Sequence, residues 1–375
     1  MIVGAIGSEG RAVVDARGAL RVVGEEWTLD WWIGADDRWR VPAREPAVRH
    51  QPLDGAPVAE TRVRVPKGDA IQRVYGIGGA GGVVVVDVEN ASPAACIVAF
   101  VVRGATTIAL DGPRVLVDGR VALIVPFPPP RWDVTDIEVE PERCGAETGP
   151  VPPRTCASGA LRATLLFPLS HRNRLRIGVV VGGDVPSLDL AQVPTADAAA
   201  RGWRRHLDGA TRLVGPVEQV AEIDFARSQV LLDPDPSAAT TAALEDWGFD
   251  EQAEWAWRGL SVRDRRAARR RTELLGDPGP AGVLLRARDG LVRDVDDGLE
   301  LFHLPPAPGV DLEVHGARTR HGRISFALRW HGEHPALLWE LADASRAVEL
   351  RVPVLAPGWS SQDAVGETLL RVTPV

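Results

Sequence analysis

Long apolar runs are missing from this chain. No segment of its 375 residues approaches the roughly 20 consecutive apolar residues that a membrane-spanning helix needs, so we expect no membrane partner. The first ten residues also lack the basic region and the apolar region of a secretory signal. We therefore expect a cytoplasmic protein.

Lysine is almost absent, since Lys67 is the only lysine among 43 basic residues. The net charge is −8, which disfavours a phosphate backbone as a partner. The densest basic run consists of Arg263, Arg265, Arg266, Arg269, Arg270 and Arg271. No aromatic residue is interleaved with these arginines, and arginines late in a helix interact favourably with its dipole. We interpret the run as part of a solvated helix and expect no nucleic acid partner.

Cysteine is scarce and odd in number. Cys144 and Cys156 flank a loop rich in proline and glycine and could form a disulfide in an oxidising compartment, and Cys96 is the third. In the absence of a secretory signal, free thiols are the favoured interpretation.

Four histidines near the C-terminus invite a zinc interpretation: His315, His321, His331 and His334. However, His331 and His334 occupy a predicted turn and not positions i and i+4 of a helix, and no cysteine lies in that part of the chain. We expect two solvated histidines in a hairpin turn, no metal and no cofactor.

The predicted elements divide the chain into three domains. Residues 1–194 contain strand after strand at the spacing of 8–12 residues that is typical of an antiparallel sandwich. Residues 195–276 contain a helical block, and residues 277–375 return to strands from about Gly282. Strands do not alternate with helices, which argues against a parallel doubly wound fold. We predict a mainly β chain with a large supersandwich-like antiparallel β-sandwich, short helical hairpins and a small C-terminal β-sandwich.

Capping residues and prolines predict five short helices in the helical block. Their expected first residues or caps are Thr195, Pro216, Ser237, Asp250 and Ser261. Helices this short must bury their apolar stripes against something larger, so we expect the block to form the interface of a homodimer or of a heteromer. In the alternative, residues 126–156 and the C-terminal sandwich cover the helices and the protein is a monomer.

Residues 76–81 match the glycine pattern of a dinucleotide-binding loop. That site requires a helix after the glycines, whereas residues 83–88 are valine-rich and predict a strand. We expect a glycine-rich hairpin loop.

Residues 27–39 combine aromatic and acidic side chains. Alternation along a strand assigns one face to the core, namely Trp27, Leu29, Trp31 and Ile33. The other face and the following turn offer Asp30, Trp32, Asp36, Asp37, Arg38 and Trp39. Aromatic rings stack on sugar faces while carboxylates accept hydrogen bonds from hydroxyls, so we predict a carbohydrate-binding site here. In the alternative, Trp32 packs under another layer and Asp37 pairs with Arg38 at the surface.

Three features together resemble a known family. A sandwich is followed by a linker helix at residues 197–203 and a helical stripe at 220–232. Residues 243–254 predict a helical hairpin in which a glycine ends one helix and an acidic residue starts the next, and residues 312–332 predict a late β segment. This order resembles the (α/α)6-toroid glycoside hydrolases, in particular glucoamylase-like actinobacterial proteins. The resemblance implies an N-terminal sandwich packed against a helical toroid, and an oligosaccharide or polysaccharide ligand.

Most of that toroid has no counterpart here, including the part that carries the family's general acid and base. The remaining helices carry Glu245, Asp246, Glu251 and Glu254, which suit helix ends or solvated faces. We find no pair suited to hydrolysis, which needs two carboxylates about 5–10 Å apart, so we assign no catalytic residue. We interpret the chain as a non-catalytic carbohydrate-binding or scaffold protein. The alternative is a glycoside hydrolase, or a subunit of one, with an unrecognised or partner-completed site.

Overall fold

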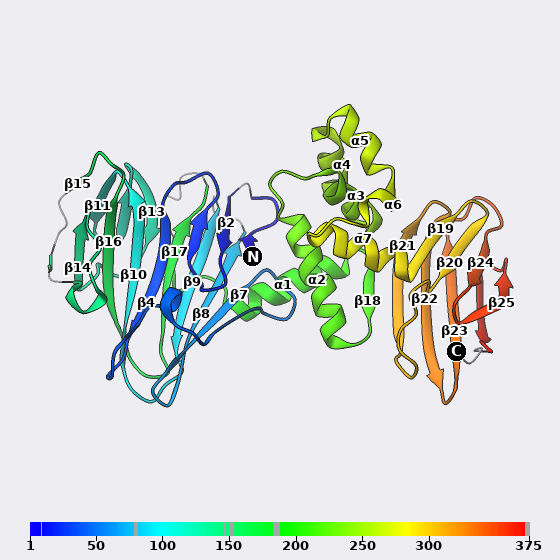
Figure 1. Ribbon diagram of the computed structural model, residues 1–375, viewed down its shortest axis with the longest axis horizontal. Coiled ribbons are helices and arrows are strands. Elements are labelled where there is room, and N and C mark those ends of the chain that lie inside the picture. The colour runs from blue at the N-terminus through cyan, green and yellow to red at the C-terminus, as the bar shows by residue number, and fades with distance from the viewer. Residues whose placement is uncertain (9, 79–81, 146, 150–152, 183–187, 372–375) are drawn as a thin grey trace. The chain divides into compact units, whose positions relative to one another are not determined.

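A computed structural model of the chain describes residues 1–8, 10–78, 82–145, 147–149, 153–182 and 188–371 (Figure 1). The chain divides into two compact units, Met1–Leu53 with Pro57–Arg201 and Asp54–Ala56 with Gly202–Val375. The described residues form a mainly β chain with several antiparallel sheets and a helical segment, which confirms the predicted fold class. None of the helices in this described part is long and apolar enough to cross a membrane.

The first unit contains two large antiparallel sheets. One has the order β1-β2-β3-β4-β10-β16-β14, with β5 paired to β4. Its strands are β1 (Ile2–Gly4), β2 (Arg11–Val14), β3 (Leu20–Val22), β4 (Thr28–Gly34), β5 (Trp39–Arg40), β10 (Cys96–Ala105), β14 (Arg131–Thr135) and β16 (Leu161–Leu169).

The other sheet has the order β15-β11-β12-β13-β17-β9-β8-β7-β6. Its strands are β6 (Val48–Pro52), β7 (Ala59–Val65), β8 (Gly68–Ile77), β9 (Val83–Asn90), β11 (Thr107–Asp111), β12 (Arg114–Val117), β13 (Arg120–Ile124), β15 (Arg154–Thr155) and β17 (Arg174–Val180). Two 3₁₀ helices, η1 (Pro42–Arg44) and η2 (Pro141–Arg143), lie in the connections.

The core of the first unit is built by strand alternation. One face of β4 and the residue before it enter the main apolar cluster, as predicted: Trp27, Leu29, Trp31 and Ile33. Apolar side chains of the second sheet, such as Val74 and Val86, complete the same cluster. Burial of these large side chains is the main favourable contribution to the stability of the unit.

A row of alternating charges crosses four adjacent strands of the second sheet. Glu60 on β7 is the cross-strand neighbour of Arg73 on β8, which neighbours Asp87 on β9, which in turn neighbours Arg176 on β17. Arg73 Nε lies 2.9 Å from Glu60 Oε2, and Arg176 Nη2 lies 3.0 Å from Asp87 Oδ2. The two carboxylates are buried, and buried charges of this kind need such partners.

The glycine-rich motif lies between two strands. Residues 79–81 of the motif lie outside the described residues, but β8 precedes them and β9 follows them in the same sheet. A strand, and not a helix, therefore comes after the glycines. The helix N-terminus that a dinucleotide pyrophosphate needs is missing from the described residues that follow the motif.

Strand β14 lies within the proline-rich segment 126–156. It pairs along its whole length with β16, so this part of the segment belongs to the first sheet. Trp132 is only 1% exposed and belongs to the main core, because it alternates with the polar positions on either side of it. The three cysteines are free thiols in the structure, including Cys144 and Cys156.

The helical segment contains the five predicted helices and two more. They are α1 (Ala196–Asp208), α2 (Val217–Leu231), α3 (Ala238–Asp246), α4 (Asp250–Gly259), α5 (Val262–Ala268), α6 (Arg271–Leu274) and α7 (Pro280–Leu291). Hydroxyl caps begin three of them. Thr195 Oγ1 accepts from the backbone N–H of Ala198, Ser237 Oγ from that of Thr240, and Ser261 Oγ from that of Asp264. Gly248, at φ +83°, follows α3 in the left-handed region that ends many helices.

Helix α7 shows that our expectation for residues after Gly282 was wrong. Pro280 occupies its first turn, and Leu284, Leu285 and Leu291 are buried on one face. Gly282 and Gly290 weaken the local helical signal, but tertiary contacts explain both, because a Cβ at either position would meet neighbouring atoms at 1.9 and 3.1 Å.

The C-terminal part contains two smaller sheets. The first, of order β18-β21-β22-β23-β26, contains β18 (Arg212–Val214), β21 (Leu312–Thr319), β22 (Gly322–His331), β23 (His334–Ala342) and β26 (Val365–Leu369). The second, of order β19-β20-β24-β25, contains β19 (Val292–Val295), β20 (Gly298–Leu301), β24 (Glu349–Val352) and β25 (Ala356–Ser361), with β20 and β24 parallel. Phe302 meets Phe326 edge to face at 5.1 Å, which joins the two sheets.

Arg227 joins four helices of the segment. Its side chain is 1% exposed, pairs with Asp224 at 2.8 Å, and donates from Nη2 to the carbonyl of Leu207 at the end of α1. Its guanidinium lies over the rings of Trp247 and Phe249, 5.4 and 5.2 Å from their centroids, at the corner between α3 and α4. Cation–π contacts of this kind are strongest when desolvated.

The apolar stripe that we expected to drive assembly is covered within the chain. Ile223 and Val230 of α2 are 5% and 4% exposed. Trp255 on α4, in contrast, is 57% exposed. Association through the helical segment stays a prediction, and any such contact would involve Trp255 and not the α2 stripe.

We expect Arg227→Met to lower the free energy of unfolding of the second unit by about 3–5 kcal/mol, because it leaves Asp224 without its buried partner. Amide hydrogen exchange in α1–α4 measures the loss. Arg258→Met is the matched control, since its pair with Glu254 is solvent-exposed and should contribute little. Equal stability of the two variants would contradict the role assigned to Arg227.

We expect the second unit to lose stability as the pH falls below about 6.5. His206 stacks on Phe249 with ring centroids 6.2 Å apart, and burial, followed by the charge of Arg227, lowers the pKa of His206 from its usual 6.5. The unfolded chain therefore takes up the proton first, so the stabilisation is complete above pH 6.5 and is lost as the pH falls through the folded pKa.

His206→Gln should flatten this dependence in the amide exchange of α1–α4. The pKa of His50 in the first unit is also lowered by burial, so His50→Gln is the control and should leave the pH dependence of the second unit unchanged. A wild-type second unit whose stability is constant from pH 7 to pH 5 would refute the assignment.

Candidate functional site

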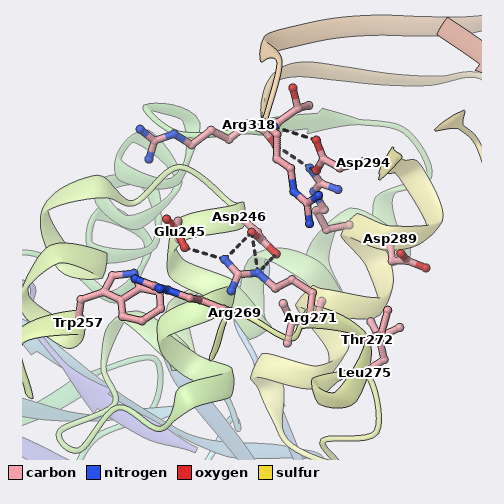
Figure 2. A pocket seen from close by; sticks show the side chains of 14 residues that line it. Glu245, Asp246, Trp257, Arg269, Arg271, Thr272, Leu275, Asp289, Asp294 and Arg318 are labelled. Carbon is pink, nitrogen blue, oxygen red and sulfur yellow. Dashed lines mark hydrogen bonds and ion pairs between the residues drawn. The ribbon is translucent and has the colours of Figure 1, made fainter. Parts of the chain in front are cut away.

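A cleft of about 560 Å³ lies in the second unit (Figure 2). Its walls come from α3 to α7, from β19 and from the end of β21. The lining residues are Glu245, Asp246, Trp257, Arg269, Arg271, Thr272, Leu275, Leu285, Arg288, Asp289, Asp294, Arg318, Thr319 and Arg320. The volume falls in the range of small-molecule sites.

Arg271 holds the two carboxylates at the end of α3. Its Nη2 lies 2.6 Å from Glu245 Oε2, and its Nε lies 3.0 Å from Asp246 Oδ2. Figure 2 shows both acidic side chains directed at the one guanidinium. This double ion pair fixes α6 against α3 and closes one wall of the cleft.

Arg288 builds the opposite wall from α7. It lies 2.6 Å from Asp294 Oδ2 and donates to the backbone carbonyls of Val292 and Arg318. The other oxygen of Asp294 accepts from the backbone N–H of Arg320 at 2.8 Å. Arg288 thus connects α7, β19 and β21. Together with the backbone N–H of Arg320, it leaves neither oxygen of Asp294 free.

The fourth carboxylate of the cleft is engaged in the same way. Asp289 accepts from Arg293 through both oxygens, at 3.0 Å and 2.5 Å. Every acidic side chain in the lining therefore has an arginine partner. Trp257 supplies an aromatic surface that is only half-buried, and Thr272 supplies an exposed hydroxyl.

The predicted carbohydrate-binding residues belong to the first unit, and none of them lines the cleft of the second unit. Trp32 is 2% exposed and packs with Ala99, Val101 and Leu166 in a small second core. The guanidinium groups of Arg103 and Arg162 lie over its ring at 5.6 and 5.8 Å. Asp30 binds Arg103 at 2.8 Å.

The turn that follows β4 is stabilised by local ion pairs. Asp37 pairs with Arg40 at 2.7 Å, and this hydrogen bond is the main cause that lowers the pKa of Asp37 to about 2. Arg38 binds Glu45 at 2.9 Å, whereas Asp36 is exposed. Trp39 is partly exposed and lies against Gly34. Carbohydrate binding by these residues stays a prediction.

Sequence reasoning identified parts of the cleft without recognising it. Glu245 and Asp246 were assigned to helix ends, and Arg269 and Arg271 to a solvated run. Trp257 was noted only as part of an apolar stripe. Residues of α7 were missed because that segment was assigned to strands. The sequence signal that could have indicated the site is the run of arginines at 263–271, taken together with the adjacent acidic residues Glu245 and Asp246.

The histidines of the C-terminal part lie where the sequence predicts. His331 and His334 are cross-strand neighbours at the end of the β22–β23 hairpin, and both are exposed. His315 pairs with Glu313 at 3.1 Å. Within the described ranges, no group of three or more histidine, cysteine or acidic side chains could hold a metal ion.

We expect Trp32→Ala to destabilise the first unit by about 3–5 kcal/mol, since it removes a ring that is 2% exposed. Trp39→Ala should leave the melting temperature of the protein nearly unchanged, because that ring is partly exposed. Thermal unfolding of the two variants measures both effects on stability. If Trp39→Ala keeps the fold and loses oligosaccharide binding, the site predicted from the sequence is supported. If Trp39→Ala unfolds the protein, that site is wrong.

Comparisons with known proteins add a distant structural likeness. No protein-family model matches this chain, and no curated protein matches it. Among solved structures, it is similar to a family GH92 alpha-mannosidase from Bacteroides thetaiotaomicron, at 9% identity and a TM-score of 0.26. The match covers 62% of this chain and 38% of the mannosidase chain, so this chain spans well under half of that protein's length.

Proposed function

We propose that this protein binds carbohydrate without catalysing a reaction, and that the cleft in its second unit is the binding site. The observation that carries the proposal is the pairing of every acidic side chain in the cleft with an arginine, beside an indole that remains reachable.

Sugar recognition uses the groups that the cleft offers. Trp257 presents a flat apolar ring, which suits the apolar face of a pyranose. Thr272 and the free Oε1 of Glu245 can exchange hydrogen bonds with ring hydroxyls. The cleft is the site we favour over residues 30–39, because Trp257 is half-buried whereas the ring faces of Trp32 are covered.

Hydrolysis is disfavoured by the same ion pairs. A glycosidase needs one carboxyl that donates a proton and a second that attacks or activates water across the bond. Glu245 and Asp246 instead share one guanidinium, and Asp289 and Asp294 are bound through both of their oxygens. The alternative, a glycoside hydrolase completed by a partner chain, would require rearrangement of these pairs.

We expect Trp257→Ala to weaken binding of oligosaccharides by about tenfold or more, because stacking on the ring supplies a large part of the contact. Trp255→Ala is a matched control on the same helix, since Trp255 is 57% exposed and does not line the cleft. Isothermal titration against a panel of neutral and acidic oligosaccharides measures the affinity of both variants. Thermal unfolding checks that they remain folded.

Two results would contradict the proposal. One is the failure of the wild-type protein to bind any oligosaccharide of the panel. The other is turnover of aryl glycosides, maltooligosaccharides or trehalose that Glu245→Gln or Asp246→Asn abolishes, which would support the glycosidase alternative. Equal loss of binding in the Trp257 and Trp255 variants would move the site out of the cleft.

A further inference from the structure

Two arginines of the cleft have no acidic partner. Arg269 is the C-terminal cap of α5, and Arg320 lies in the turn between β21 and β22. In the part of the chain that the structure describes, neither guanidinium makes a hydrogen bond or an ion pair. The other arginines of the lining are all paired, such as Arg271 with Glu245. The two cations are therefore available to a ligand.

The charge of the cleft is opposite in sign to that of the chain. Its lining contains five arginines and four carboxylates, a difference of +1, whereas the whole chain has a net charge of −8. The excess consists of arginines without partners, so it is not neutralised locally. A concave wall focuses such a potential and attracts anions over the rest of an acidic surface.

The backbones of both arginines are held in place although their side chains are free. The backbone N–H of Arg269 donates to the carbonyl of Ala267 at the end of α5. The backbone N–H of Arg320 donates to Asp294 Oδ1 at 2.8 Å, and Asp294 is itself held by Arg288. A ligand that binds these side chains needs to order only their rotamers, which reduces the entropic cost of binding.

We propose that the ligand of the cleft is an acidic carbohydrate whose oxyanions are bound by Arg269 and Arg320. This inference rests on the proposed function. The planar guanidinium fork matches a carboxylate and binds it through two parallel hydrogen bonds. Trp257 stacks on the apolar face of the sugar ring, while the two arginines bind its charged group. The carboxylate of a uronic acid and the sulfate ester of a sulfated sugar share this chemistry.

Titration of the full-length chain distinguishes these ligands. The probes are an oligogalacturonate, its methyl ester, a neutral oligosaccharide of the same length and a sulfated oligosaccharide. We expect the oligogalacturonate to bind at least about tenfold more tightly than its methyl ester, since charge-assisted hydrogen bonds are lost in the ester. Affinity should fall as the salt concentration rises, because exposed arginines are screened.

Arg269→Gln and Arg320→Gln should each weaken binding of the acidic probe by about ten- to a hundredfold and leave the affinity for the neutral probe unchanged. Arg263→Gln is the matched control. It removes the same charge from the same helix, α5, but Arg263 is exposed outside the cleft. Thermal unfolding checks that the three variants remain folded.

The possible results separate this inference from the proposed function. If neutral and acidic probes bind equally well, or if the variants behave like Arg263→Gln, the acidic ligand is refuted while carbohydrate binding stands. If no probe binds, both are refuted. Tighter binding of the sulfated probe supports the inference and identifies the oxyanion as a sulfate. Tighter binding of single-stranded DNA that also depends on Arg263 would overturn the inference in favour of nucleic acid.

Discussion

The buried guanidinium of Arg227 is the constraint on which the helical segment depends. It ties α2 to the last carbonyls of α1 and to the two rings at the corner between α3 and α4. Trp247, one of those rings, donates from its indole to the carbonyl of Leu284 on α7. The end of α3 and the face of α7 are thereby held at a fixed separation. These two elements supply opposite walls of the cleft, so its shape depends on one buried charge that pairs with Asp224 and donates to the carbonyl of Leu207.

Arginine performs structural work throughout this chain because lysine is almost absent. Its planar fork can hold two carboxylates at once, as Arg271 does in the cleft and Arg73 does with Glu60 and Glu89 in the first unit. Carboxylates held in this way stabilise walls and sheets and are poor candidates for acid–base chemistry. Within the cleft, the arginines that have no such task are Arg269 and Arg320, and these are the ones left for a ligand. Arginine is therefore both the residue that holds the walls of the cleft together and the residue that we propose binds the ligand.

Much of the fold could be predicted because it follows from local rules. Ser237 and Ser261 cap helices through hydrogen bonds within three residues, and Gly248 adopts a conformation that few other residues tolerate. Alternation along residues 27–33 separated the core face of β4 from its outer face correctly. Helix α7 was missed because Gly282 and Gly290 lower its local helix propensity, and the close fit of Gly290 against Leu304 is not expressed in that propensity.

The sequence by itself determined the type and order of most elements and the face that β4 turns to the core, since capping and side-chain periodicity act over a few residues. Only the tertiary structure decided which charges are free. Arg269 and Arg271 stand two positions apart in one basic run, yet Arg271 binds Glu245 and Asp246 from a helix 25 residues earlier, while Arg269 faces the cleft. It likewise decided that Trp32 is covered by Arg103 and Arg162 while Trp257 remains reachable. Such outcomes depend on which distant segments meet, and long-range contacts leave no periodic trace in the sequence.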